Sequence, residues 1–184
     1  MKRLILASGS PRRKELLQQA NLSFEVKVSS IEETFDPNES PEKIAMNLAL
    51  QKAKDVWKDE SDAIVIGADT IVVLKNNILG KPKNEADAYE MLSSLSGQTH
   101  HVVTGVAICS AHKEKVFYEK TSVTFWELSS QEIEQYIESK DPMDKAGAYG
   151  IQTLGALFVK KIDGDYFSVV GLPLAKTVRE LSQF

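Results

Sequence analysis

The stretch that decides the fold is residues 4–17, which read LILASGSPRRKELL. The first four apolar residues predict a short buried strand, and the small residues at 8–10 end it. Ser10 is then a favourable N-cap, and Pro11 suits the first helical position, where its missing N–H has no helical partner to lose. The chain is therefore expected to run from a strand through a tight loop into a helix.

Two arginines fall in the first turn of this helix, Arg12 and Arg13. The positive end of the helix dipole favours acidic residues there, so this placement is unusual. Backbone N–H groups, the Ser8 and Ser10 hydroxyls and two guanidinium groups at one point would suit a polyanion, most plainly phosphate. A solvated basic turn is the alternative, and this stretch alone leaves both open.

Length and composition limit the class of protein. The chain has 184 residues, 42% of them hydrophobic and 26% charged, which is typical of a soluble globular domain. We expect one domain over 1–184, or two closely packed lobes. The net charge of -4 argues against general attraction to nucleic acid or to an anionic membrane.

Targeting and cysteine content point to the cytoplasm. The apolar run that follows the first basic residues is too short for a signal peptide, and no run is long enough to span a membrane. Cys109 is the one cysteine of the sequence, which excludes an internal disulfide framework and a cysteine-based zinc site. We therefore expect a cytoplasmic protein that does not bind membranes.

Strand and helix patterns alternate along the rest of the chain. Helices are predicted after the caps Ser40, Asn84 and Ser129, to about 57, 95 and 139, and at 172–184. Strands are predicted at 24–28, 63–74, 101–110 and 116–128, with a hairpin formed by 156–162 and 166–170. His100 and His101 are expected at a strand edge, facing opposite ways. This order predicts an α/β fold with a mixed sheet.

Asp69 is the most informative single residue. It lies within the most apolar run of the chain, residues 63–74. A carboxylate inside a buried strand is costly unless something compensates its charge. A structural aspartate bonded to a backbone group or an arginine is one interpretation. A general base or a ligand for a hard divalent cation is the other, and the small neighbours Gly67 and Ala68 favour it.

Several blocks together resemble the signature sequences of the Maf family. They are SGSPRR at 8–13, GADT at 67–70, GKP at 80–82, DKAGAYGIQ at 144–152, DGDY at 163–166 and VGLP at 170–173. Because the blocks follow in order over nearly the whole chain, the resemblance covers the whole domain. It implies an α/β fold with an elongated, twisted mixed sheet, flanking helices and two lobes around a cleft, similar to the inosine triphosphate pyrophosphatases.

The resemblance also implies an activity. Maf proteins are nucleoside triphosphate pyrophosphatases that use a divalent cation (Mg²⁺, Mn²⁺ or Co²⁺) and release a nucleoside monophosphate and pyrophosphate. The subgroup resembled here prefers dTTP and UTP, and modified pyrimidine nucleotides would extend this to a house-cleaning role. A link to septum formation and a homodimer are further expectations from the family.

Residue roles carry over by position from the resemblance. Asp69 falls at the proton acceptor that activates water, and Glu33 with Asp69 falls at the metal position. The triphosphate ligands would be Ser8, Arg13, Lys52 and Lys81, and the dTTP/UTP specificity residues would be Arg12, Thr70 and Gln152. An amide such as that of Gln152 offers a donor and an acceptor, which suits the O4 and N3–H edge of uracil or thymine.

Two other functions stay open. A regulator of cell division could bind nucleotides without turnover, but a pure binder gains nothing from the Asp69 carboxylate facing a polyanion. A nucleic-acid binder could use the basic turn of residues 12–14, but the net charge of -4 and the absence of an aromatic stacking platform beside it argue against this.

Overall fold

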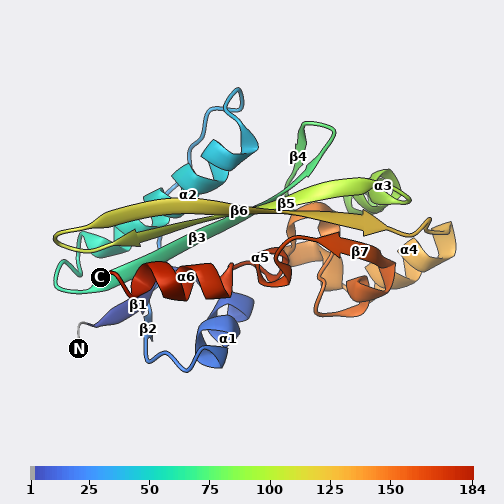
Figure 1. Ribbon diagram of the computed structural model, residues 1–184. Helices are drawn as coiled ribbons and strands as arrows, with labels where there is room; N and C mark the ends of the chain where they lie inside the picture. Colours follow the sequence, from blue (N-terminus) through green and yellow to red (C-terminus); the bar gives the residue numbers. More distant parts are fainter. Residues whose placement is uncertain (1–2) are drawn as a thin grey trace. The chain divides into compact units, whose positions relative to one another are not determined.

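The computed structural model describes residues 3–184 and divides into two compact units (Figure 1). Within the described residues, unit 1 consists of 3–70, Thr104–Glu119 and Gly171–Phe184. Unit 2 consists of Ile71–Val103 and Lys120–Val170. The chain therefore passes between the units several times, and each unit is built from segments far apart in the sequence.

The strands form one mixed sheet. Its order is β2-β1-β3-β5-β6-β7, with β4 paired to β3. The strands are β1 (Leu4–Leu6), β2 (Glu25–Val26), β3 (Ile64–Leu74), β4 (Asn77–Leu79), β5 (Thr99–Cys109), β6 (Glu114–Phe125) and β7 (Val159–Asp163). In unit 1, β1 runs parallel to both β2 and β3. In unit 2, β4 is antiparallel to β3 and β7 is antiparallel to β6. The expected α/β class with a mixed sheet is confirmed.

Most helices of residues 3–184 begin where the sequence predicts. The helices are α1 (Pro11–Gln19), α2 (Pro41–Trp57), α3 (Glu85–Leu95), α4 (Ser130–Glu138), α5 (Tyr166–Val170) and α6 (Leu174–Leu181). The exceptions are α5, which the sequence predicts as a strand, and α6, which begins two residues after the predicted start. Short 3₁₀ segments lie at η1 (Asp141–Asp144), η2 (Ala146–Ala148) and η3 (Leu154–Phe158). The side chains of Ser40, Asn84 and Ser129 accept hydrogen bonds from the first turns of α2, α3 and α4, and Ser129 with Glu132 completes the capping box.

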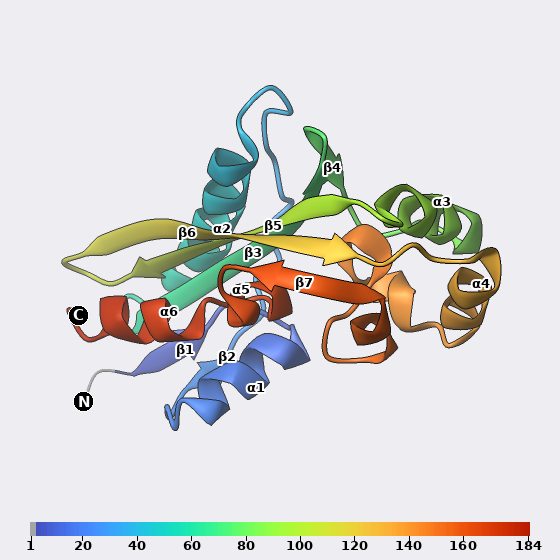
Figure 2. The ribbon, with the colours of Figure 1, turned by 45° about the vertical axis from the view of Figure 1, so that its right-hand side comes forward.

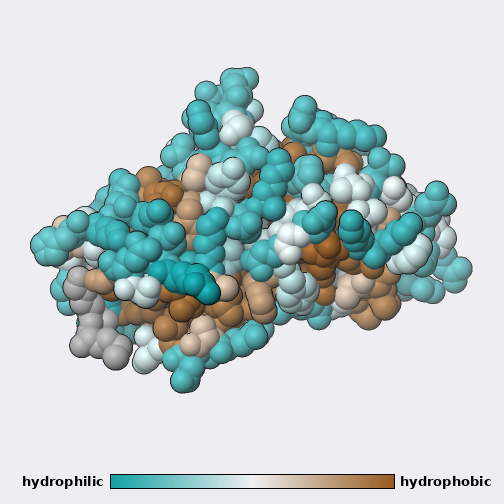
Figure 3. All heavy atoms as spheres, viewed as in Figure 1, coloured by the Kyte–Doolittle hydropathy of each residue, from teal (hydrophilic) through white to brown (hydrophobic). Residues whose placement is uncertain are grey.

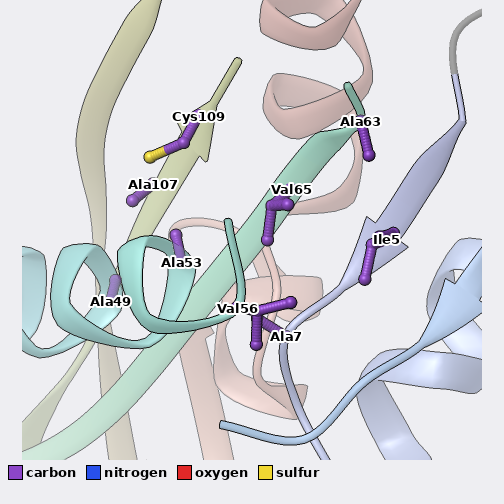
Figure 4. Packing of buried hydrophobic residues seen from close by; sticks show 9 residues of the cluster. All are labelled: Ile5, Ala7, Ala49, Ala53, Val56, Ala63, Val65, Ala107 and Cys109. Carbon is purple, nitrogen blue, oxygen red and sulfur yellow. The ribbon is translucent and has the colours of Figure 1, made fainter. Parts of the chain in front are cut away.

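The core of unit 1 brings the backbone of α2 directly against the sheet. Figure 4 shows Ala49, Ala53 and Val56 of this helix near Val65 of β3 and other buried residues of the same cluster. A Cβ on Gly67 would lie 2.3 Å from the carbonyl oxygen of Ala49. Because only glycine permits this approach, the helix that carries Lys52 is fixed at a short distance from the strand that carries Asp69.

The core of unit 2 contains an aromatic cluster. His100, Phe125 and Tyr149 pack edge to face with ring centroids 4.8 to 5.4 Å apart, and Tyr136 packs on Phe158 at 5.0 Å. The prediction that His100 lies at a strand edge is wrong, because its ring is fully buried. Figure 2 shows α3 and α4 side by side at the end of this unit.

The predicted hairpin at 156–162 and 166–170 is also wrong. Residues 166–170 form the short helix α5, and β7 pairs with β6 instead. The side chain of Asp165 accepts hydrogen bonds from the backbone N–H groups of Phe167 and Ser168. These bonds satisfy N–H groups at the start of a helix, so Asp165 ends the strand and starts the helix.

The surface carries scattered apolar side chains. Hydrophilic residues cover much of the face seen in Figure 3, with hydrophobic areas between them, one of them in the region of β7. Among the exposed large apolar side chains of unit 2 are Trp126, Leu154 and Leu157. Across residues 3–184, every helix falls short of the length and apolar character that crossing a membrane requires.

Candidate active site

The loop between β1 and α1 buries Ser8 and places both arginines at the start of the helix. Ser10 is the N-cap and Pro11 the first helical residue, as expected, although the Ser10 side chain makes no capping hydrogen bond. The backbone N–H of Ser10 instead donates to Oγ of Ser8 at 3.3 Å. Arg12 is half-buried, and its positive charge acts on the neighbouring guanidinium of Arg13.

Arg13 holds three parts of unit 1 together. Its Nη1 donates to Oγ of Ser8 at 3.2 Å, and its Nη2 donates to Oγ1 of Thr70 at 3.0 Å. Its Nε donates to the carbonyl oxygen of Gly171 at 2.8 Å. Burial lowers the pKa of the Arg13 guanidinium below its ordinary value, and the charge of Asp69 opposes this shift. A guanidinium is charged at any physiological pH, so this one is a fixed, partly desolvated positive charge.

A second group of charges lies beside Thr70. The ammonium of Lys52 on α2 lies 2.6 Å from Oδ1 of Asp69 and 3.1 Å from Oε1 of Glu33. The Lys52 and Asp69 side chains are 15% and 13% exposed, whereas Glu33 is 45% exposed. One partly buried cation therefore draws two carboxylates from different segments to the same point. The Asp69 charge is compensated by Lys52, not by the backbone group or arginine of the structural interpretation.

Two residues that the sequence analysis did not single out complete this region. Thr104, fully buried on β5, shares a 2.8 Å hydrogen bond between its hydroxyl and that of Thr70. Gly171 accepts from Arg13 and has a φ of +135°, a conformation open to glycine and rarely to other residues. The criterion that identified Asp69 was a polar side chain within an apolar run. It would also have identified Thr104, which is the one polar residue in the run 102–109.

Unit 2 contains three further motif blocks, at 80–82, 144–152 and 163–166. The backbone N–H of Gly147 donates to the carbonyl oxygen of Gly80 at 3.0 Å, which ties the block at 144–152 to the segment that carries Lys81. A Cβ on Gly147 would lie 2.9 Å from a methyl group of Val72, so this contact too depends on glycine. Lys81 and Gln152 are both exposed.

The structure thus divides the candidate residues into two sets. Ser8, Arg12, Arg13, Glu33, Lys52, Asp69 and Thr70 belong to unit 1, where hydrogen bonds, ion pairs and the charges acting on Arg13 link them. Lys81 and Gln152 belong to unit 2. In unit 1, fixed cations stand beside a pair of carboxylates. That arrangement can bind a polyanion and can hold a base near it.

Comparison with known proteins gives the family. A family model described as Maf-like protein matches residues 3–184. A protein of Bacillus cereus (strain G9842) named dTTP/UTP pyrophosphatase is 61% identical over 184 residues, which cover 100% of this chain and 96% of that protein. One of the same name from Bacillus thuringiensis subsp. konkukian is 60% identical with the same coverage. A HAM1 protein from Coxiella burnetii is similar in fold, with a TM-score of 0.57, 14% identity and complete coverage of both chains.

Proposed function

The chain belongs to the Maf family, and from this premise we propose that it is a pyrophosphatase that hydrolyses dTTP and UTP. In this reaction water enters, the bond between the α- and β-phosphates breaks, and the nucleoside monophosphate and pyrophosphate leave. The names of relatives 60–61% identical over the full length support the activity and the substrates.

The observation that carries the proposal is the position of Asp69, whose carboxylate pairs with Lys52 directly beside Thr70. The 2.6 Å ion pair to Lys52 fixes one carboxylate oxygen of Asp69. A general base must be held within hydrogen-bond reach of the water that it deprotonates, and the rigid contact of α2 with β3 supplies that restraint. Asp69 would take the proton of the attacking water.

The carboxylates of Glu33 and Asp69 also fit a divalent cation. Both carboxylates contact the ammonium of Lys52, so they lie close enough together to bind one small cation. Among residues 3–184, no group of three or more His, Cys, Asp or Glu side chains is placed to hold a metal. Mg²⁺ is commonly held by one or two carboxylates, with water and substrate phosphates as its other ligands, so Glu33 and Asp69 suffice. Such an ion would neutralise phosphate charge and make bound water more acidic.

The positive groups account for binding of the triphosphate. Arg13 presents a planar guanidinium whose orientation is set by its bonds to Ser8, Thr70 and Gly171. Such a preorganised fork suits phosphate oxygens, because little side-chain entropy is lost when they bind. Lys52 would add a second positive charge for the phosphates while it stays paired with Asp69, and Lys81 would add a third.

The base would be selected by Arg12, Thr70 and Gln152. The Thr70 hydroxyl is oriented by its bonds to Arg13 and Thr104. The Gln152 amide can accept from N3–H and donate to O4 of uracil or thymine. Cytosine has an acceptor at N3 and a donor at C4, so it would leave these groups mispaired and be rejected.

The test is pyrophosphate release from dTTP, UTP, CTP, ATP and GTP with Mg²⁺ or Mn²⁺, using the wild type, Asp69→Asn and the control Asp62→Asn. Asp62 is a surface carboxylate, 71% exposed, beside Arg3. We expect turnover of dTTP and UTP well above the others, lost in Asp69→Asn and retained in Asp62→Asn. Modified pyrimidine triphosphates added to the panel would test the house-cleaning role.

Two results would change the proposal. Metal-dependent nucleotide binding without turnover would favour the regulator of cell division. Undiminished turnover by Asp69→Asn would retain the enzyme and remove Asp69 from the reaction.

A further inference from the structure

The turn that carries Gln152 is held in place by a partly buried network of polar side chains. In this four-residue turn, 150–153, the backbone N–H of Thr153 donates to the carbonyl oxygen of Gly150 at 3.4 Å, and the hydroxyl oxygen of Thr153 lies 3.1 Å from the same carbonyl oxygen. Gly150 is buried, whereas Gln152 is exposed. The orientation of the Gln152 side chain therefore depends on what fixes the two ends of the turn.

One carboxylate, that of Asp141, reaches both ends. Its Oδ2 accepts a hydrogen bond from the hydroxyl of Thr153, which is the last residue of the turn. The same oxygen accepts from the hydroxyl of Tyr136 at 2.6 Å. The Tyr136 hydroxyl in turn accepts from the backbone N–H of Gly150, the first residue of the turn, at 3.0 Å. Tyr136 is thus the link between Asp141 and the start of the turn.

Lys145 compensates the charge of this carboxylate. Its ammonium lies 3.0 Å from Oδ1 of Asp141, 2.6 Å from the Asp141 carbonyl oxygen and 2.7 Å from Oδ1 of Asp144. The Lys145 side chain is only 10% exposed. Burial acts to raise the pKa of Asp141, but the bonds from Thr153, Tyr136 and Lys145 outweigh it and the net shift is downward. The network is therefore built around an ionised Asp141.

Close packing leaves the turn little freedom to move. A Cβ on Gly150 would lie 2.6 Å from Cε of Lys145 and 2.8 Å from Oγ1 of Thr153. A Cβ on Gly155 would lie 2.6 Å from the Gly150 carbonyl oxygen and 3.0 Å from the Tyr136 hydroxyl. The backbone of the turn thus rests directly on the atoms that hydrogen-bond to it.

We propose that Tyr136, Asp141 and Lys145 are positioning residues for Gln152, and that they set the discrimination between uracil and cytosine nucleotides. This inference rests on the proposed function. An amide separates two bases only if its donor and acceptor are held within a fraction of an ångström and a few tens of degrees of their partners. A turn released at one end lets the amide rotate and accept either base edge.

The test uses Tyr136→Phe, which removes the hydroxyl and keeps the ring that packs on Phe158. The kcat/KM values for UTP and CTP are measured for each variant, with the melting temperature as a measure of folding. We expect the UTP-to-CTP ratio to fall about tenfold, chiefly through loss of UTP turnover, because recognition by hydrogen bonds is the larger source of selectivity. Asp141→Asn should lower the ratio as well. Gln152→Ala lacks the amide altogether, so its UTP-to-CTP ratio is the lowest that loss of positioning can give.

Tyr149→Phe is the matched control. It removes a hydroxyl from the same aromatic cluster, but that hydroxyl bonds Nε2 of His100 at 2.8 Å. We expect a comparable fall in melting temperature with an unchanged UTP-to-CTP ratio, a result that general loosening of unit 2 would not give.

The outcomes separate the two proposals. A ratio unchanged in both Tyr136→Phe and Asp141→Asn, with Gln152→Ala lowering it, would overturn the positioning role and leave the proposed function intact. An equal fall in Tyr149→Phe would also overturn it. A wild type that hydrolyses neither UTP nor dTTP would refute both.

Discussion

Acidification below pH 6.5 should destabilise the protein through one side chain, His100. The ring is fully buried between Phe125 and Tyr149, and burial lowers its pKa from 6.5 to about 4. Its Nδ1 has no hydrogen-bond partner among the described residues, so a proton added there would be buried without an acceptor. Protonation is therefore much easier in the unfolded chain than in the folded one.

The sign and the size follow from linkage. Between pH 6.5 and about 4 the unfolded state binds the proton and the native state does not, so the free energy of unfolding falls as the pH falls. From pH 7.5 to pH 5 the loss is about 2 kcal/mol, since each pKa unit is worth about 1.4 kcal/mol. The part of this window above pH 5 lies above the range in which ordinary carboxylates titrate, so His100 dominates there.

The assay is urea unfolding followed by circular dichroism at several pH values between 4.5 and 7.5. The midpoint of the wild type should fall by about 1 M between pH 7.5 and pH 5, for a typical dependence on urea. His100→Gln keeps a hydrogen-bonding side chain for Tyr149 and removes the titration, so its midpoint should vary much less. His112→Gln, at an exposed position between β5 and β6, should behave as the wild type. Equal pH dependence in wild type and His100→Gln would refute the reasoning.

Two further predictions concern the contact of α2 with β3. Lys52→Met should lower kcat/KM for UTP by about a hundredfold or more, because it removes a partly buried cation that holds Asp69 and is proposed to meet the phosphates, whereas Lys54→Met, at a half-exposed position on the same helix, should leave it nearly unchanged. Comparable kinetics for the two variants would argue against the role of Lys52. Gly67→Ala should cost about 1–3 kcal/mol of unfolding free energy, because its Cβ would lie 2.3 Å from the Ala49 carbonyl oxygen. Urea unfolding measures this, and an unchanged midpoint would show that α2 can move away at no cost.

Much of the fold could be predicted because its signals are local. Ser10 with Pro11, Asn84, and Ser129 with Glu132 each mark a helix start by chemistry within four residues, and the structure has helices beginning there. The Asn84 and Ser129 side chains accept hydrogen bonds from N–H groups that the helix itself leaves unpaired, so their effect depends little on the rest of the protein.

The errors arose where two local signals competed or where burial decided the outcome. Asp163-Gly164-Asp165 suits a hairpin turn, but Asp165 also caps a helix, and the edge of β6 was available to pair with β7. His100 follows a polar segment and shows no apolar signal of its own. Its burial depends on aromatic residues 25 and 49 positions away, which no local pattern contains.

By itself the sequence determined the family, the mixed α/β class and the identity of the chemical groups, because these depend on residue types and on short-range spacing. Only the tertiary structure decided which groups meet. It placed Lys52 between Asp69 and Glu33, bound Arg13 to Gly171, and set the Gln152 turn on Tyr136 and Asp141. The contacts of Lys52, of Arg13 with Gly171 and of the turn with its supports join residues 12 to 158 positions apart. Their geometry comes from close packing at Gly67 and Gly150, where the absence of a side chain has a consequence only once another part of the chain has packed against it.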